Sequence, residues 1–165
     1  MGIFDRLKKT ASTVITVSDA SVIAPASGKM IDIKEVSDPV FSTEMMGKSA
    51  AFQYEGDEIT ICSPANGTLG VLFPTGHAFG VVMNNGMEIL VHIGINTVDA
   101  NGQGFKVLKK QGQNIKAGDP VVKVNLKQLT GKYDMSTMLI ITNANNKTVK
   151  FRQPGPVNLG DPVFA

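Results

Sequence analysis

Short apolar runs separated by turn-forming residues constrain this chain more than any other feature of its sequence. From about residue 21 onward, runs rich in Val and Ile alternate with Gly, Pro, Asn and Asp, with turn signals at intervals of roughly eight to twelve residues. This spacing predicts an all-β fold, an antiparallel sandwich or barrel. The predicted strands are 22–24, 28–33, 50–54, 59–62, 67–72, 78–83, 89–93, 120–124 and 138–142. Helical patterns are confined to the N-terminus and to one-turn stretches at 105–110 and 126–130.

Two sequence patterns recur along the chain. Residues 24–28, Ala-Pro-Ala-Ser-Gly, are echoed by residues 63–67, Ser-Pro-Ala-Asn-Gly. The triplet Asp-Pro-Val also repeats, and its copies at 119–121 and 161–163 each follow a glycine and lead into an apolar run. Because two different patterns recur together, we expect a duplicated β-motif.

Length and composition favour one soluble β domain. The 165 residues are enough to bury a sizeable core, and no linker interrupts residues 19–165, which we expect to form a single domain. Residues 1–18 are predicted to be a flexible or amphipathic tail, with weak membrane contact as one interpretation. Cys62 is the only cysteine, which fits a cytoplasmic location. The formal net charge of +2 is too small and too scattered for a nucleic-acid partner.

The only two histidines, His77 and His92, flank the turn signal Asn84-Asn85-Gly86. Asn and Gly tolerate positive φ, so these residues predict a β-hairpin. A two-residue loop puts both rings on one face, with Cβ atoms roughly 5 to 8 Å apart. A three-residue loop puts them on opposite faces, because side chains alternate along a strand. Two isolated imidazoles within reach of each other indicate a site.

A facing pair of imidazoles fits two chemistries. The first is a divalent-metal site, but zinc usually takes three or four protein ligands, and no paired His or Cys motif completes a set. In the second, one histidine is a nucleophile and the other stabilises the transferred group. Gly94, two residues after His92, is expected to open room on that face. Thr75, two residues before His77, can hydrogen-bond a ring nitrogen. The second chemistry is favoured.

Residues 86–98, Gly-Met-Glu-Ile-Leu-Val-His-Ile-Gly-Ile-Asn-Thr-Val, closely resemble a known signature. It is the signature of the glucose-type enzyme IIA component of the bacterial phosphoenolpyruvate-dependent sugar phosphotransferase system. Similar landmarks cover nearly the whole chain, at 1–8, 24–28, 38–41, 75–79, 102–105 and 112–119. The resemblance implies an antiparallel β-sandwich of the duplicated barrel-sandwich hybrid type, in a cytoplasmic protein without cofactor or metal.

The resemblance also implies a reaction. His92 would accept a phosphoryl group on Nε2 from a histidine-containing phosphocarrier protein and pass it to a cysteine of a sugar permease IIB domain. His77 would steady the phosphoryl group and Thr75 would orient His77. The implied docking residues are Asp38, Val40, Phe41, Met45, Met46, Phe73, Asn96 and Val98. Two alternatives remain open: a regulatory binding module that senses phosphorylation state and engages transporters or kinases, and a metal-dependent hydrolase.

The chain departs from the family pattern near the predicted site. Asn96 stands where members usually have Asp, which removes a charge that helps dock the basic carrier. Lys48-Ser49 replaces a common Asp-Gly pair on the expected rim of the site. We expect these changes to alter partner choice and to leave the histidine chemistry intact. The Met1-Gly2 start favours a stand-alone component over a permease domain, and the sugar would be selected by the permease.

Overall fold

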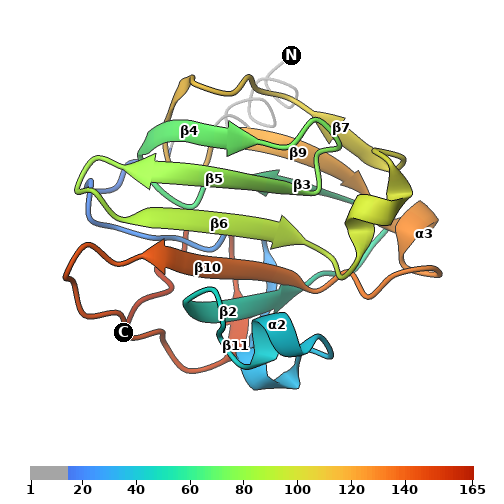
Figure 1. Cartoon of the computed structure of the whole chain (residues 1–165), viewed down its shortest axis with the longest axis horizontal. Coiled ribbons are helices and arrows are strands. Elements are labelled where there is room, and N and C mark those ends of the chain that lie inside the picture. The colour runs from blue at the N-terminus through green and yellow to red at the C-terminus, as the bar shows by residue number, and fades with distance from the viewer. Residues whose placement is uncertain (1–14) are drawn as a thin grey trace, which may run out of the picture.

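A computed structural model describes residues 15–165, which form two antiparallel sheets stacked as a sandwich (Figure 1). The strands are β1 (Gly28–Ile31), β2 (Lys48–Gln53), β3 (Glu58–Cys62), β4 (Gly67–Leu72), β5 (Ala78–Met83), β6 (Glu88–Ile93), β7 (Phe105–Val107), β8 (Asn114–Ile115), β9 (Pro120–Asn125), β10 (Thr137–Asn143) and β11 (Gly155–Val157). The helical turns are η1 (Ile33–Glu35), α2 (Pro39–Ser42), η2 (Thr97–Ala100) and α3 (Leu126–Leu129). The prediction of an all-β antiparallel sandwich is confirmed.

The larger sheet has eight strands in the order β11-β1-β2-β10-β6-β5-β4-β8, and the smaller has the order β3-β9-β7. The larger order consists of two matching halves, β11-β1-β2-β10 and β8-β4-β5-β6, which meet between β10 and β6. Corresponding strands also pair in the same register. Gly28, which begins β1, lies opposite Val157, and Gly67, which begins β4, lies opposite Ile115.

The recurring sequence patterns make equivalent contacts at the ends of these halves. The amide N–H of Ala24 donates to the carbonyl oxygen of Asp161 over 2.8 Å. In the other half, the amide N–H of Ser63 donates to the carbonyl oxygen of Asp119, also over 2.8 Å. Each bond joins the first residue of a five-residue repeat (24–28 or 63–67) to the aspartate of an Asp-Pro-Val turn. The predicted internal duplication is therefore present in the backbone hydrogen bonding.

Several predicted elements differ from the structure. The one-turn helix predicted at 105–110 is wrong: this stretch forms β7, where half-buried Phe105 and Val107 flank an exposed lysine and pair with β9. Pairing with a neighbouring strand overrides a weak local helical pattern. The strand predicted at 28–33 ends at residue 31, because the Asp32 side chain caps η1 by accepting the Lys34 N–H at 2.9 Å.

Two other differences concern short elements. Helix α2 was not predicted, although Asp38 at the N-cap and Pro39 at the first helical position are its start signals. Residues 22–24 form no named strand and contribute only an isolated bridge between Ile23 and Pro162. The one-turn helix predicted at 126–130 is confirmed as α3.

The larger sheet has apolar clusters on both of its faces. The main cluster lies between the two sheets and includes Ile89, Val91 and Ile93 of β6. A smaller cluster lies on the outer face, where Phe41 of α2 packs with residues of η1, β2 and β10. His92 alternates with the inward residues of β6, so it emerges on the outer face beside α2.

The amphipathic segment predicted for residues 1–18 falls largely outside the described residues. Residues 15–18 belong to no helix or strand. Across residues 15–165, every helix is too short to cross a membrane.

Candidate active site

The two histidine rings meet on the outer face of the larger sheet. Their centroids are 5.3 Å apart and their planes are nearly perpendicular, at 79°. His92 lies near the end of β6, opposite Ala78 of β5. His77 comes immediately before β5 and is only 3% exposed. The expectation that the hairpin brings two isolated imidazoles together holds.

The two rings meet although the hairpin loop has the length that was expected to place them on opposite faces of the sheet. Met83 donates its N–H to the carbonyl oxygen of Met87, so the loop has three residues, 84–86, with Gly86 at φ 88°. The prediction that a three-residue loop would separate the rings is wrong. Strand alternation applies only within regular strands, and His77 lies outside β5, directly after Gly76 with φ 77°. The turn before the strand therefore sets the direction of the His77 ring.

Gly94 fixes the proton of the His92 ring. Nδ1 of His92 is 2.8 Å from the carbonyl oxygen of Gly94. A carbonyl oxygen can only accept, so Nδ1 carries the hydrogen and Nε2 of the neutral ring keeps its lone pair. The sequence suggested that Gly94 opens room in front of the His92 ring, but the structure shows no such space at Gly94. Gly94 is buried at φ 81°, and a Cβ there would collide with Thr97 and approach the Met135 sulfur.

Thr75 and Phe73 hold the second ring. The Thr75 hydroxyl oxygen is 2.6 Å from Nδ1 of His77, the contact that the sequence suggested. Phe73 meets the same ring edge-on, with centroids 5.0 Å apart. On the other side of the pair, Phe41 packs against His92 with centroids 4.9 Å apart. Both imidazoles are thus held by aromatic neighbours and by one hydrogen bond each at Nδ1.

Both rings are neutral at pH 7. Burial, and to a lesser extent the nearby His77, lower the pKa of His92 to about 4, although the Gly94 hydrogen bond and the Asp38 charge oppose this shift. Burial also lowers the pKa of His77. A neutral His92 has a free lone pair on Nε2, which makes this atom a nucleophile at physiological pH.

The lowered pKa of His92 predicts a loss of stability in acid. The unfolded chain binds a proton near the usual pKa of 6.5, whereas the folded chain does so near 4, so stability falls as pH drops through this interval. We expect wild type to lose roughly 3 kcal/mol more free energy of unfolding than His92→Asn between pH 7 and pH 4. Urea unfolding of both proteins at the two pH values measures this difference. Equal losses would show that His92 is not held neutral by its surroundings.

Residues 20–147 match the family described as phosphoenolpyruvate-dependent sugar phosphotransferase system, EIIA 1. The chain belongs to this family. It is thus a component of a phosphotransferase system that serves sugar transport. Among solved structures, the EIIA 1 chain is similar to the glucose permease IIA from Mycoplasma capricolum, with 38% identity and a TM-score of 0.81. That match covers 87% of this chain and 93% of the Mycoplasma chain.

Two curated relatives come from Staphylococcus carnosus (strain TM300). The PTS system glucose-specific EIICBA component is 37% identical over 157 residues, and the glucoside-specific EIICBA component is 36% identical over 152. These alignments cover 94% and 92% of the EIIA 1 chain. The chain spans only 23% and 22% of the length of these two relatives.

Most side chains expected at the docking face are exposed. The exposed apolar ones are Val40, Met45, Met46, Phe73 and Val98. Phe41 is buried instead and packs against His92. Asp38 caps α2 by accepting the Val40 N–H at 2.9 Å. Asn96 is exposed in the left-handed conformation, φ 59°, and its side chain makes no capping bond.

Lys48 was expected on the rim of the site, but it lines a separate cavity of about 280 Å³. Lys34, Lys150 and Arg152 line the same cavity, and neither histidine does. In the described part of the EIIA 1 chain, no three His, Cys, Asp or Glu side chains are grouped to hold a metal ion.

An apolar groove that was not predicted lies on the same sheet face as His92. Gly80 of β5 lies opposite Leu90 of β6, two residues along from the pair formed by Ala78 and His92. These residues, with Val71 and Val82, line a cavity of about 260 Å³. The alternation of side chains along β6 predicts that Leu90 lies on the same face as His92. The groove itself could not be predicted, because it depends on which residue of β5 lies opposite Leu90.

Proposed function

We propose that this EIIA 1 chain is a cytoplasmic phosphocarrier in which His92 accepts a phosphoryl group on Nε2. The donor is a histidine-containing phosphocarrier protein, and the acceptor is a cysteine of a sugar permease IIB domain. The observation that carries this proposal is the bond from His92 Nδ1 to the Gly94 carbonyl oxygen, which leaves the Nε2 lone pair free. Membership in the EIIA 1 family supports the same chemistry.

Each transfer is an in-line displacement at phosphorus. In the first, the Nε2 lone pair of His92 forms a bond to phosphorus as the bond from phosphorus to the donor's ring nitrogen breaks. The His92 ring then carries positive charge, and its Nδ1–H bond to Gly94 becomes charge-assisted and stronger. In the second, a cysteine thiolate attacks phosphorus, and the electron pair of the breaking P–N bond returns to Nε2. Such transfers need positioning and charge stabilisation more than covalent machinery.

His77 stabilises the transferred group in this mechanism. Its ring lies 5.3 Å from that of His92, close enough to reach phosphoryl oxygens on Nε2 of the neighbour. If the Thr75 hydroxyl donates to Nδ1 of His77, the ring hydrogen lies on Nε2 and can be donated to the phosphoryl group. Thr75 is therefore assigned to set the His77 tautomer.

The role of Thr75 predicts a modest kinetic effect. We expect Thr75→Val to slow phosphoryl transfer to the IIB domain roughly tenfold, because the His77 ring loses the bond that orients it. Thr75→Ser keeps the hydroxyl and should restore most of the rate. Quenched-flow transfer from phosphorylated protein to IIB measures both variants. A wild-type rate in Thr75→Val would exclude this role.

The partners must bring a donor or acceptor side chain onto the outer face of the sheet. The exposed apolar side chains beside α2 and around the histidines suit a partner surface of similar character. Asn96 makes the face less acidic than a family member with Asp at this position, so we expect weaker attraction for a basic carrier. The sugar is set by the permease partner.

Reconstitution tests the proposed function. Incubation with phosphoenolpyruvate, enzyme I and the histidine-containing carrier should give an acid-labile phosphoryl adduct, because N-phosphorylated imidazole hydrolyses in acid. A family member of known activity is labelled in parallel as the positive control. If the control is labelled and this protein is not, the phosphocarrier proposal fails.

A further inference from the structure

The turn that holds His92 is itself held by a neighbouring segment. The amide N–H of Gly94 donates to the carbonyl oxygen of Ser136 at 3.0 Å. The next amide, of Ile95, donates to the carbonyl oxygen of Asp134 at 2.8 Å. Residues 134–136, which directly precede β10, therefore bind the two amides on either side of the Gly94 carbonyl group.

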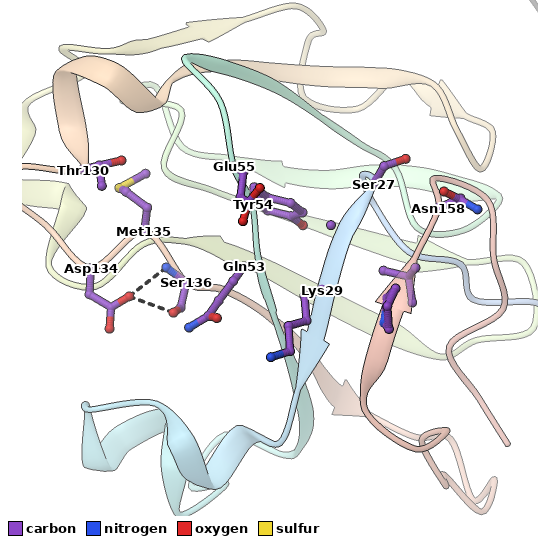
Figure 2. A pocket seen from close by; sticks show the side chains of 13 residues that line it. Ser27, Lys29, Gln53, Tyr54, Glu55, Thr130, Asp134, Met135, Ser136 and Asn158 are labelled. Atoms are coloured by element: carbon purple, nitrogen blue, oxygen red, sulfur yellow. Dashed lines mark hydrogen bonds between the residues drawn. The ribbon is translucent and has the colours of Figure 1, made fainter.

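A carboxylate organises this segment. Oδ1 of Asp134 accepts the backbone N–H of Ser136 at 2.9 Å and its hydroxyl at 2.7 Å (Figure 2). Ser136 is buried, with 4% of its surface exposed, whereas Asp134 is exposed. Asp134, Met135 and Ser136 line a cavity of about 810 Å³, and neither histidine lines it. The carboxylate thus acts from outside the site, through the backbone of Ser136.

The turn at Gly94 has a left-handed backbone and packs closely against residues 134–136, so we expect its position to depend on them. Gly94 has φ 81°, and a Cβ at this position would come within 3.0 Å of the Met135 sulfur. The turn is thus packed tightly against residues 134–136. A shift of that segment would move the Gly94 carbonyl oxygen relative to Nδ1 of His92, since hydrogen bonds weaken steeply with poor alignment.

The direction of that carbonyl group has a chemical consequence. In free neutral histidine, the tautomer with hydrogen on Nε2 is the more populated one. That tautomer has no lone pair on Nε2 and cannot attack there. The Gly94 carbonyl oxygen, 2.8 Å from Nδ1, reverses this preference. Loss of its alignment would return His92 toward the unreactive tautomer.

We propose that Asp134 and Ser136 are positioning residues for phosphoryl transfer, which hold the Gly94 carbonyl so that Nδ1 of His92 keeps its hydrogen. The proposal rests on the proposed function for its kinetic consequence. Its structural part, the tautomer of His92, is independent of any reaction. Neither residue touches the phosphoryl group, so neither is catalytic.

The test combines a tautomer measurement with a rate measurement. We expect ¹⁵N NMR of the imidazole rings to show Nδ1–H at His92 in wild type and a shift toward Nε2–H in Asp134→Ala. The same variant should accept phosphoryl groups roughly tenfold more slowly. Asp134→Asn keeps an acceptor oxygen for Ser136 and should restore both readouts. The His77 tautomer should be the same in all variants.

Asp161→Ala is the matched control. Asp161 also accepts a backbone N–H in a turn, from Asn158 at 2.8 Å, and within the described residues it forms no hydrogen bond with Gly94 or with residues 134–136. Its loss should lower stability without changing the His92 ring. If Asp134→Ala does not fold, Ser136→Ala takes its place; it removes the hydroxyl bond to Asp134 but keeps the backbone bond, so a smaller change in the same direction is expected in both readouts.

Three outcomes would overturn the proposal: a wild-type tautomer in Asp134→Ala, a tautomer change of equal size in Asp161→Ala, or no rescue by Asp134→Asn. If wild type itself is never phosphorylated, the proposed function fails, whereas the tautomer measurement still decides the structural part.

Discussion

Replacing His92 with glutamine will abolish phosphoryl labelling, with acceptance slowed by at least about a thousandfold. The Nε2 atom of His92 is the only proposed nucleophile, and the amide nitrogen of glutamine has no lone pair available for attack. Neighbouring groups stabilise the transferred phosphoryl group but cannot bond to phosphorus in its place. Labelling with radioactive phosphoenolpyruvate through enzyme I and the carrier measures the loss.

Two controls separate this loss from misfolding. The variant should keep its far-ultraviolet circular dichroism, because His92 lies on the outer face of β6 while Val91 and Ile93 pack in the main core. An alkaline-stable, acid-labile adduct in the wild type identifies phosphohistidine. Labelling that persists in His92→Gln at more than a few percent of the wild-type rate would place the phosphoryl group on another residue.

Replacing His77 with glutamine will separate the two halves of the reaction. We expect the adduct to form at a rate within a few-fold of wild type, while transfer to the IIB domain slows roughly a hundredfold. In the first step the nucleophile is a neutral imidazole. In the second it is a thiolate, which brings negative charge toward a phosphoryl group that is already negative. His77 lies 5.3 Å from His92 and can offset this charge by donating its Nε2–H, whereas the flexible glutamine side chain lacks the Thr75 bond that orients the ring.

The measurement needs both half-reactions on the same protein. Phosphorylated His77→Gln is prepared to completion, and its reaction with IIB is followed by quenched flow. Thr75→Val serves as the intermediate case, since it loosens the same ring without removing it. Equal slowing of acceptance and onward transfer would show that His77 acts in both steps, contrary to this assignment.

The sequence predicted the fold class because turn residues and alternating apolar runs are local signals. Each Gly, Pro or Asn acts on its own backbone, so the spacing of turns predicted the strands without knowledge of the sheet. The recurring Asp-Pro-Val turns likewise indicated the duplication, which appears in the bonds of Asp119 and Asp161. The segment at 105–107 was mispredicted because pairing with β9, a distant strand, decided its state.

In the candidate site, too, local features were predicted correctly and features that depend on distant segments were not. The sequence identified His77, His92 and Thr75, because histidines are rare in this chain and the hairpin signal lies between them. Two other expectations were wrong: that a three-residue loop would separate the rings, and that Gly94 would open room in front of His92. Both errors concern residues at the ends of strands, where the regular alternation of side chains no longer applies.

The sequence by itself determined that the chain is all-β and duplicated, with its two histidines on either side of a hairpin turn. The family resemblance implied Nε2 of His92 as the acceptor, but only the tertiary structure shows what keeps that nitrogen free. The free Nε2 depends on the Gly94 carbonyl oxygen, which is held by residues 134–136 from about forty positions further along the chain. The physical reason is that a hydrogen bond needs a particular distance and direction, and contacts between remote segments set both.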